Sequence, residues 1–468
     1  MNFLERFFKI RENNTTIRRE IYAGSVSFLA VAYILAVNPA ILSETGMPQG
    51  GVLCATALAG FAGTLAMSLL ANAPLVLAPA MGLNAFFAYT VVIGMGFSWQ
   101  LALFAVFLEG IIFILLSATS LRSRLIDAIP MQLKYAMGAG IGLFITLIAF
   151  KSAHIVEAHP ATLITMHNFT SDSFGTSGIS AVLAFAGILF TGYMFHKRVP
   201  GALLLGIFVT WLCGIYCEIT GIYEVNAEKG FYSMIPSFSL DSYLTPFREF
   251  AGTFCAAFQT DNWQCTASTS SGWSLLFSLD FLIVCFAFLF TDFFDTVGTV
   301  NGAVVNTPLM KEDGTIPRLK QIMLADSIAT FTGAILGTST TTTFAESAAG
   351  INAGARTGMA ALSASLLFLL SLLLSPVFMA IPGFATAPAL VVVGLLMAKA
   401  LCHIDLNQLS SAIPAYLLIA GTVFTYSVSD GLGMGIISWT LLNCLQKGKV
   451  NIFMWVITIL FILKYILL

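Results

Sequence analysis

Glu346 lies in the most polar stretch of the sequence, TSTTTTFAESAAGINAGARTG at residues 338–358. The rest of the chain is apolar, because 58% of its 468 residues are hydrophobic and only 9% are charged. At the centre of a membrane an Asp, Lys or Arg side chain costs roughly 2.5–3.5 kcal/mol or more, and a buried Glu belongs to the same rare class. We therefore expect Glu346 to be compensated by a bound substrate or by a proton.

Further carboxylates fall inside apolar segments, and besides Glu109, whose role is left open, they are Asp292, Asp295 and Asp326. Asp292 and Asp295 are three residues apart in FLIVCFAFLFTDFFDTVGTV, so a helix places both on one face. Two neighbouring carboxylates in a dry site do not easily both ionise, and at least one should carry a proton. We expect Asp295 to lie nearer the ligand and Asp292 to orient it or hold the proton, with the exchanged assignment left open. Asp326, in LADSIATFTGAILG, is interpreted as structural, holding helices or extended backbone by hydrogen bonds.

The elements that must position these carboxylates are membrane spans. Apolar runs of about 20 residues recur along the chain, which predicts an all-α polytopic membrane protein with about fourteen spans. The expected spans are 21–42, 51–71, 83–98, 100–117, 131–150, 179–195, 199–217, 274–300, 320–336, 345–355, 358–378, 385–402, 412–428 and 430–446. Residues 450–468 either span the membrane or lie in its interface.

The basic residues predict the orientation of the chain. Arg6, Lys9 and Arg11 precede the first span, which favours a cytoplasmic N-terminus in a plasma membrane, most simply a bacterial inner membrane. The even-numbered loops carry most of the other basic residues, among them Arg122 and Arg124. The start of the chain does not have the pattern of a cleaved signal peptide.

The spans divide into two halves around a long loop. Residues 1–217 form a first seven-span repeat, 218–273 an external loop, 274–446 a second seven-span repeat and 447–468 a C-terminal apolar segment. Seven is odd, so the second repeat is inverted relative to the first. Inverted repeats place the substrate site at mid-membrane, where corresponding helices break. In the external loop Cys255 and Cys265 form a disulfide or remain two free thiols, with both alternatives open.

Corresponding spans are interrupted in the two halves. Residues 77–84, LAPAMGLN, break the third span with a proline and a glycine, and the β-branched run 338–344 precedes the tenth. Extended backbone at membrane depth survives only where protein buries it or where it lines a cavity. We expect the two extended pieces to cross and pair, each leading into a half-helix whose N-terminus points at the centre. Asn84 and Glu346 lie near these N-termini, and Phe344 is placed to stack on a flat ligand, although packing is its commoner role.

Several function classes find no support in the sequence. The eight cysteines lack metal-ligand spacing, no GxxxxGK[ST] phosphate loop appears, and neither GxSxG nor HExxH is present. The five histidines all fall in loops or at span ends. We therefore expect a transporter rather than an enzyme, with no metal, no cofactor and no nucleic-acid partner.

Several long motifs together resemble the AzgA-like purine permeases of the nucleobase–cation symporter superfamily. They are MGLNAFFAYTVV (81–92), FTDFFDTVGT (290–299), IPRLKQIMLADSIAT (316–330), GTSTTTTFAESAAG (337–350) and ARTG (355–358). The resemblance covers nearly the whole chain. It implies a core domain of spans 1–4 and 8–11, a gate domain of spans 5–7 and 12–14, and proton symport. The motifs of the family place substrate or coupling residues at Gly82, Asn84, Asp292, Asp295 and Glu346, whereas Ala80 departs from the glycine that is usual there.

The expected activity is proton-coupled uptake of a purine base, adenine or guanine/hypoxanthine, by alternating access. In this scheme a proton neutralises Asp295 or Asp292, and the base binds Glu346 and Asn84. The alternative is an anion or other nucleobase carrier of the same architecture, and an anion is disfavoured by Glu346 and by the lack of Lys or Arg beside the breaks. The expected partners are thus a purine base, protons and the lipid bilayer, and a homodimer stays open.

Overall fold

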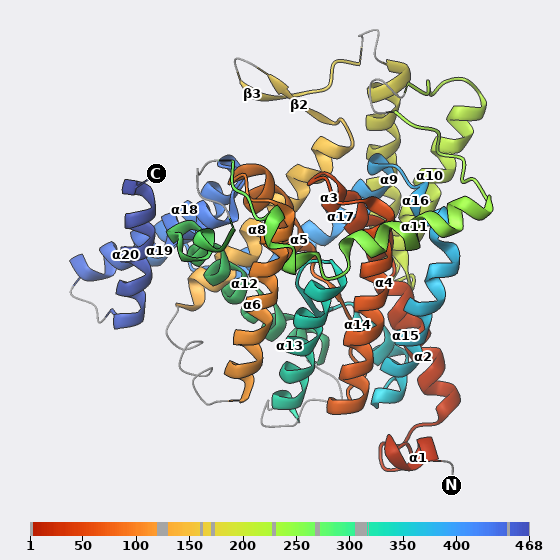
Figure 1. Ribbon diagram of the computed structural model, residues 1–468, viewed down its shortest axis with the longest axis horizontal. Coiled ribbons are helices and arrows are strands. Elements are labelled where there is room, and N and C mark those ends of the chain that lie inside the picture. Colours follow the sequence, from red (N-terminus) through yellow and green to blue (C-terminus); the bar gives the residue numbers. More distant parts are fainter. Residues whose placement is uncertain are drawn as a thin grey trace.

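The computed structural model describes residues 3–118, 130–159, 162–169, 174–226, 231–266, 272–304, 316, 318–446 and 450–467. These residues are mostly helical (Figure 1). Within them, eight helical stretches are long and apolar enough to cross a membrane. The prediction of a helical polytopic membrane protein is therefore confirmed, whereas the number of fourteen spans remains a prediction. The basic residues Arg122 and Arg124 lie outside the described part of the chain.

One group of helices packs around the interrupted segments. Its members are α2 (Ile17–Val31), α3 (Ile34–Ser43), α4 (Gln49–Ala66), α6 (Trp99–Ala118), α12 (Leu279–Val304), α13 (Leu319–Leu336), α14 (Ser347–Ala353) and α15 (Gly358–Ser371). Helix α4 packs on α13 and α15, α6 packs on α12 and α13, and α2 packs on α14 and α15. Small residues permit these close approaches, since a Cβ atom on Gly110 of α6 would lie 2.8 Å from the Phe331 backbone of α13.

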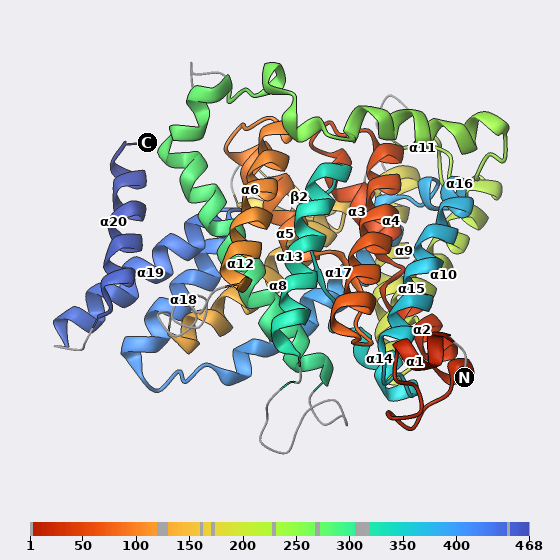
Figure 2. The ribbon, with the colours of Figure 1, turned by 60° about the horizontal axis from the view of Figure 1, so that its bottom comes forward.

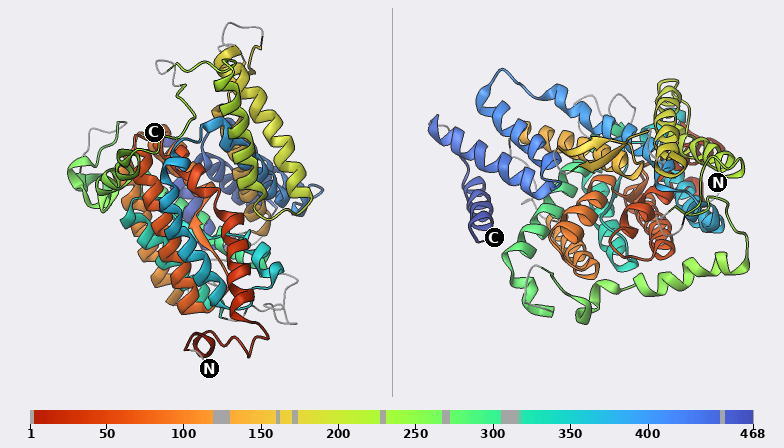
Figure 3. Two further views of the ribbon diagram at one scale, coloured as in Figure 1. Left: turned by 90° about the vertical axis from the view of Figure 1, so that its right-hand side faces the viewer. Right: turned by 90° about the horizontal axis from the view of Figure 1, so that it is seen from above.

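A second group of helices packs beside the first. Its members are α8 (Met131–Ser152), α9 (Ile179–His196), α10 (Ala202–Ile219), α17 (Gly383–Ala398), α18 (Leu409–Phe424) and α19 (Val428–Leu445). Helix α17 packs on α8, α9 and α10, and α18 packs on α8 and α19. Gly142 of α8 and Gly394 of α17 meet so closely that a Cβ atom on Gly142 would lie 2.5 Å from the Gly394 carbonyl oxygen. Figure 3 shows α9 and α10 standing as a pair at the side of the molecule.

Two short strands cross in the interior of the first group. Strand β1 (Leu77–Pro79) pairs with β4 (Thr341–Thr343) in antiparallel register, with Leu77 opposite Thr343 and Pro79 opposite Thr341. Strand β1 leads into α5 (Met81–Ala85), which continues as π-helical turns over 86–94, and β4 leads into α14. The predicted crossing of two extended segments is confirmed.

Protein groups provide hydrogen-bond partners for the backbone of this crossing. Thr64 Oγ1 of α4 accepts a hydrogen bond from Leu77 N over 2.9 Å and donates to Leu77 O over 3.1 Å. Ser347 Oγ accepts from Val76 N over 2.9 Å, and the Phe344 amide donates to Val76 O over the same 2.9 Å. Side chains thus provide the partners that non-helical backbone needs at membrane depth.

The loops after α8 and α10 contain structure that the sequence analysis did not anticipate. A hairpin of β2 (Val156–His159) and β3 (Leu163–Met166) follows α8, and helix α11 (Leu240–Thr253) lies across one end of the molecule (Figure 2). The Glu249 carboxylate on α11 accepts from Gly50 N over 2.8 Å at the first turn of α4, which fastens α11 to the helix group beneath it.

Cys255 and Cys265 are separate thiols in this structure, so the disulfide alternative does not describe it. The Cys265 thiol donates a weak hydrogen bond to Met95 O over 3.5 Å. The C-terminal segment forms α20 (Ile452–Leu467), which packs on α19 and α12. The remaining short helices are α1 (Phe3–Phe7) and α16 (Ser375–Met379).

Candidate substrate site

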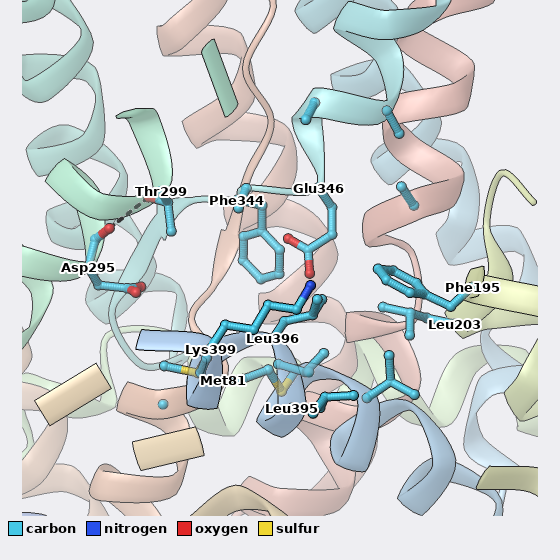
Figure 4. A pocket seen from close by; sticks show the side chains of 18 of the residues that line it. Met81, Phe195, Leu203, Asp295, Thr299, Phe344, Glu346, Leu395, Leu396 and Lys399 are labelled. Atoms are coloured by element: carbon cyan, nitrogen blue, oxygen red, sulfur yellow. Dashed lines mark hydrogen bonds between the residues drawn. The ribbon is translucent and has the colours of Figure 1, made fainter. Parts of the chain in front are cut away.

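A cavity of about 1620 Å³ lies between the two helix groups. Its lining comes from α2, α12 and α14 of the first group, from α5, and from α8, α9, α10 and α17 of the second group. Of the residues that the sequence analysis assigned to substrate or coupling, Gly82, Asp295, Phe344 and Glu346 line this cavity. Figure 4 shows the last three around the open space.

Glu346 occupies the N-cap position of α14, three residues after the end of β4 and two after Phe344. Its carboxylate is partly exposed to the cavity and accepts a hydrogen bond from the Tyr33 hydroxyl to Oε1 over 3.2 Å. Tyr33 is fully buried and also lines the cavity. The sequence analysis missed it, because a single tyrosine in an apolar span gives no sign of the element that it faces.

Asp295 presents the second carboxylate to the cavity from α12. It is partly exposed, and Thr291 and Thr299, one turn before and after it, line the same wall. The Thr299 hydroxyl donates to the Asp295 backbone carbonyl over 2.8 Å, so the Asp295 side chain is left free for the cavity (Figure 4).

Gly82 allows α5 to approach α8. A Cβ atom at this position would lie 2.7 Å from Ile141 Cγ2, which is closer than side chains approach one another. A larger residue here would push α5, which begins directly after β1, away from the cavity wall.

Asn84 lies behind the cavity rather than in its lining. It is fully buried, and its Oδ1 atom accepts a hydrogen bond from the Ser339 hydroxyl. Its Nδ2 group has no hydrogen-bond partner among the described residues. In this conformation Asn84 therefore joins α5 to the segment before β4 and does not face the open space.

Asp292 also points away from the cavity. Residues three apart on a helix differ by about 60° in direction, and this rotation separates Asp292 from Asp295. Asp292 is fully buried, its Oδ2 atom accepts from the Thr330 hydroxyl over 3.3 Å, and its carboxyl group lies within hydrogen-bonding reach of Glu109 on α6. Glu109 in turn accepts from the Thr340 hydroxyl over 2.8 Å, next to β4.

Asp326 binds the strand itself. Its Oδ1 atom accepts from the Thr343 amide over 2.7 Å and from the Thr343 hydroxyl over 2.8 Å. Its Oδ2 atom accepts from the Thr296 hydroxyl over 2.6 Å. Asp326 thus ties α13, α12 and β4 together. Among the described residues, no group of three or more His, Cys, Asp or Glu side chains has the arrangement of a metal site.

Basic side chains line the opposite part of the cavity. They are Lys134 on α8, His196 and Arg198 between α9 and α10, and Lys399 and His403 after α17. The sequence analysis noted only that no Lys or Arg adjoins the breaks, and helix packing brings these more distant residues to the same space.

Comparisons with known proteins agree with this arrangement. The Permease family matches residues 18–436. The chain belongs to this family. It is 39% identical over 479 residues to the guanine/hypoxanthine permease PbuG of Bacillus subtilis, covering 99% of this chain and 100% of that protein. It is 35% identical over 466 residues to the adenine permease AdeP of Escherichia coli, covering 99% of this chain and 96% of that protein. A putative permease of Methanocaldococcus jannaschii, MJ0326, is 38% identical over 468 residues, covering 100% of this chain and 99% of that protein.

The resemblance to purine permeases is therefore confirmed over the full length, and these relatives are transporters, not enzymes. Solved structures share the fold at lower identity. The transmembrane domain of the cyanobacterial bicarbonate transporter BicA has a TM-score of 0.60 at 15% identity, covering 89% of this chain and 97% of that one. SLC26A9 has a TM-score of 0.60 at 11% identity, covering 95% of this chain and 68% of that one.

Proposed function

We propose that this permease is a secondary active transporter that takes up a purine base, adenine or guanine/hypoxanthine, together with protons. The observation that carries the proposal is the opening of Asp295 and Glu346 into one cavity beside the crossed strands. The names of the relatives PbuG and AdeP support the substrate class.

A purine base matches the chemistry of the Glu346 wall. The base is flat and carries ring N–H donors, and a carboxylate accepts from two adjacent donors in charge-assisted hydrogen bonds. Phe344 precedes Glu346 by two residues and lies beside it in the cavity, where its ring can stack on the base (Figure 4). Tyr33 holds one carboxylate oxygen and leaves the other available.

Proton coupling is assigned to Asp295 on α12. Asp295 faces the cavity and is the group that a proton from solution reaches, while Asp292 is held behind the wall with Glu109. Asn84 acts from the same buried side by holding the half-helix at its position. One proton entering down a membrane potential releases about 2.3 kcal/mol per 100 mV, which supports roughly fifty-fold accumulation at that voltage.

Alternating access follows from a cavity shared by two helix groups. We assign spans 1–4 and 8–11 to a core that carries Asp295 and Glu346, and spans 5–7 and 12–14 to a gate beside it. The basic residues around the cavity lie at helix ends that the charge pattern assigns to the cytoplasm. The structure is accordingly interpreted as the inward-open state of a plasma-membrane protein whose N-terminus is cytoplasmic and whose repeats are 1–217 and 274–446.

An anion carrier is the second candidate, favoured by the cavity-lining Lys134, Arg198 and Lys399. The likeness to the bicarbonate transporter concerns the fold alone, and two carboxylates in the same cavity oppose an anion. Both candidates are secondary transporters, so the substrate assay separates them.

The test is uptake by the full-length protein in liposomes with a defined proton gradient. Labelled hypoxanthine, adenine, guanine and bicarbonate are offered in turn, and internal pH is followed with a trapped dye. We expect one or more of the bases to accumulate with proton entry, and an uncoupler to abolish the accumulation. Bicarbonate accumulation without uptake of any base would reject the purine assignment, and base uptake without proton entry would reject symport.

A further inference from the structure

Charges of opposite sign line opposite walls of the cavity. The carboxylates Asp295 and Glu346 come from α12 and α14, whereas the lysines Lys134 and Lys399 come from α8 and the end of α17. The helices that carry the lysines pack on each other. The carboxylates therefore belong to one helix group and the lysines to the other.

Lys399 is the cation that points toward the candidate binding carboxylate. Figure 4 shows its extended side chain crossing the cavity with the ammonium group directed at Glu346. The Lys399 side chain is exposed and has no ion-pair partner within 4.0 Å among the described residues. Two cavity-lining side chains near Lys399, Met81 of α5 and Leu396 of α17, are apolar and offer it no acceptor.

Glu346 likewise has an oxygen available. Its Oε1 atom accepts from Tyr33, and the carboxylate is otherwise open to the cavity. An ammonium group on a flexible four-carbon stem reaches different positions by rotamer changes alone. The Lys399 ammonium group is more than 4.0 Å from the Glu346 carboxylate in this conformation, and a change of Lys399 rotamer toward Glu346 would bring the two charges together when no ligand lies between them.

We propose that Lys399 is an internal competitor of the substrate, which pairs with Glu346 when the cavity is empty and must leave before a purine base binds. The inference rests on the proposed function, because it takes Glu346 as the group that receives the base. The pair stabilises the empty inward-open state. Lys399 thereby lowers the affinity of this state for the base and favours release of the base into the cytoplasm.

Binding of hypoxanthine, adenine and guanine to the full-length protein in detergent tests the proposal by titration calorimetry. Pairs between exposed charges contribute about 0.2–1 kcal/mol, so Lys399→Gln should bind its base about 1.4- to fivefold more tightly than the wild type. The gain should shrink between about 20 mM and about 500 mM NaCl, because salt screens the pair in the wild type. Lys399→Arg should retain the wild-type affinity.

Lys197→Gln is the matched control. Lys197 is an exposed cation at the C-terminal end of α9, and it does not line the cavity. Its ammonium group lies 5.7 Å from the centre of the Tyr193 ring. Its removal changes the surface charge equally and should leave affinity unchanged. Unchanged or weaker binding by Lys399→Gln would overturn the proposal, as would an equal gain in Lys197→Gln.

A measurement without substrate separates this inference from the proposed function. Thermal unfolding of the wild type, Lys399→Gln, Glu346→Gln and the double variant forms a double-mutant cycle at low salt. We expect non-additive shifts, because either single change already removes the pair. Additive shifts in melting temperature would overturn the Lys399–Glu346 pair even if purine bases bind. Failure of every base to bind the wild type would overturn the proposed function, and the double-mutant cycle would then still test the Lys399–Glu346 pair.

Discussion

Replacing Asp326 by alanine should destabilise the strand crossing and, through it, the candidate binding site. Asp326 is fully buried and accepts four hydrogen bonds, two from Thr343, one from Thr296 and a longer one of 3.5 Å from Thr342. The Thr296 hydroxyl can turn to Thr342, whose Oγ1 atom lies 2.8 Å away. The Thr343 amide has no such alternative, because its N–H group is fixed by the backbone of β4.

The expected loss follows from these contacts. Leaving one buried amide without a partner costs about 1–3 kcal/mol, and each hydrogen bond to a charged group contributes about 1.5–3 kcal/mol when all partners are present. Since the hydroxyls find other acceptors, the net destabilisation should be about 2–4 kcal/mol. The entropy of unfolding scales with chain length, so this loss corresponds to a melting temperature about 2–4 °C lower for a chain of this size. Asp326→Asn keeps an acceptor for Thr343 and should lose less than half as much.

The assay is thermal unfolding of the purified protein in detergent, combined with hypoxanthine binding at a temperature where both variants are folded. Asp241→Ala is the control, because Asp241 is an exposed acid whose nearest cation, Arg248 Nη1, is 3.8 Å away. Such surface pairs contribute about 0–1 kcal/mol. A melting temperature for Asp326→Ala equal to that of the control would refute the view that this carboxylate holds β4.

Three further predictions concern the candidate site, each measured on the full-length protein in liposomes. Glu346→Gln should fold and insert but no longer accumulate purine, because an amide cannot accept from two ring N–H groups; normal accumulation would contradict the binding role. Asp295→Asn should still exchange purine across the membrane but without purine-driven proton entry, and intact proton entry in this variant would remove Asp295 from coupling. Asp292→Asn changes a residue behind the cavity wall, so it should keep proton entry and unfold at a lower temperature. Asn84→Ala removes the hydrogen bond that Asn84 accepts from Ser339 behind the cavity wall, a loss of about 1–3 kcal/mol. It should lower the melting temperature and, by loosening α5, raise the apparent KM by at most roughly 5- to 150-fold, whereas an unchanged KM with a lower melting temperature would show that its effect is confined to stability.

The interrupted segments could be predicted because local chemistry determines them. Pro79 cannot continue the hydrogen-bond ladder of a helix, and the threonine run before Phe344 favours extended backbone. The cost of bare backbone in a membrane then requires the two segments to meet. The register, with Leu77 opposite Thr343, could not be predicted, because it depends on Asp326 and Thr64 holding each strand at a fixed depth.

The different roles of Asp292 and Asp295 were only partly predictable from the sequence. A spacing of three residues places Asp292 and Asp295 on the same side of a helix, but their directions around the helix axis differ by about 60°, so only one of them faces the cavity. That choice depends on α6, whose Glu109 takes the position beside Asp292. Lys399 was missed for the same kind of reason, since it enters the cavity from a helix end more than fifty residues after Glu346.

The pairing of β1 with β4 has a consequence for how the chain is made. Pro79 and Thr341 are neighbours in the sheet but are separated by about 260 residues, so at roughly 5–20 residues per second the ribosome needs about 13–50 s to synthesise the partner. During that interval β1 is already at the translocation machinery with its strand partner missing. Thr64, only thirteen residues before Leu77, supplies both a donor and an acceptor to the Leu77 backbone and is synthesised before it. The nascent first half therefore already satisfies the Leu77 backbone with its own Thr64 before the second half is made, and these bonds persist in the finished structure.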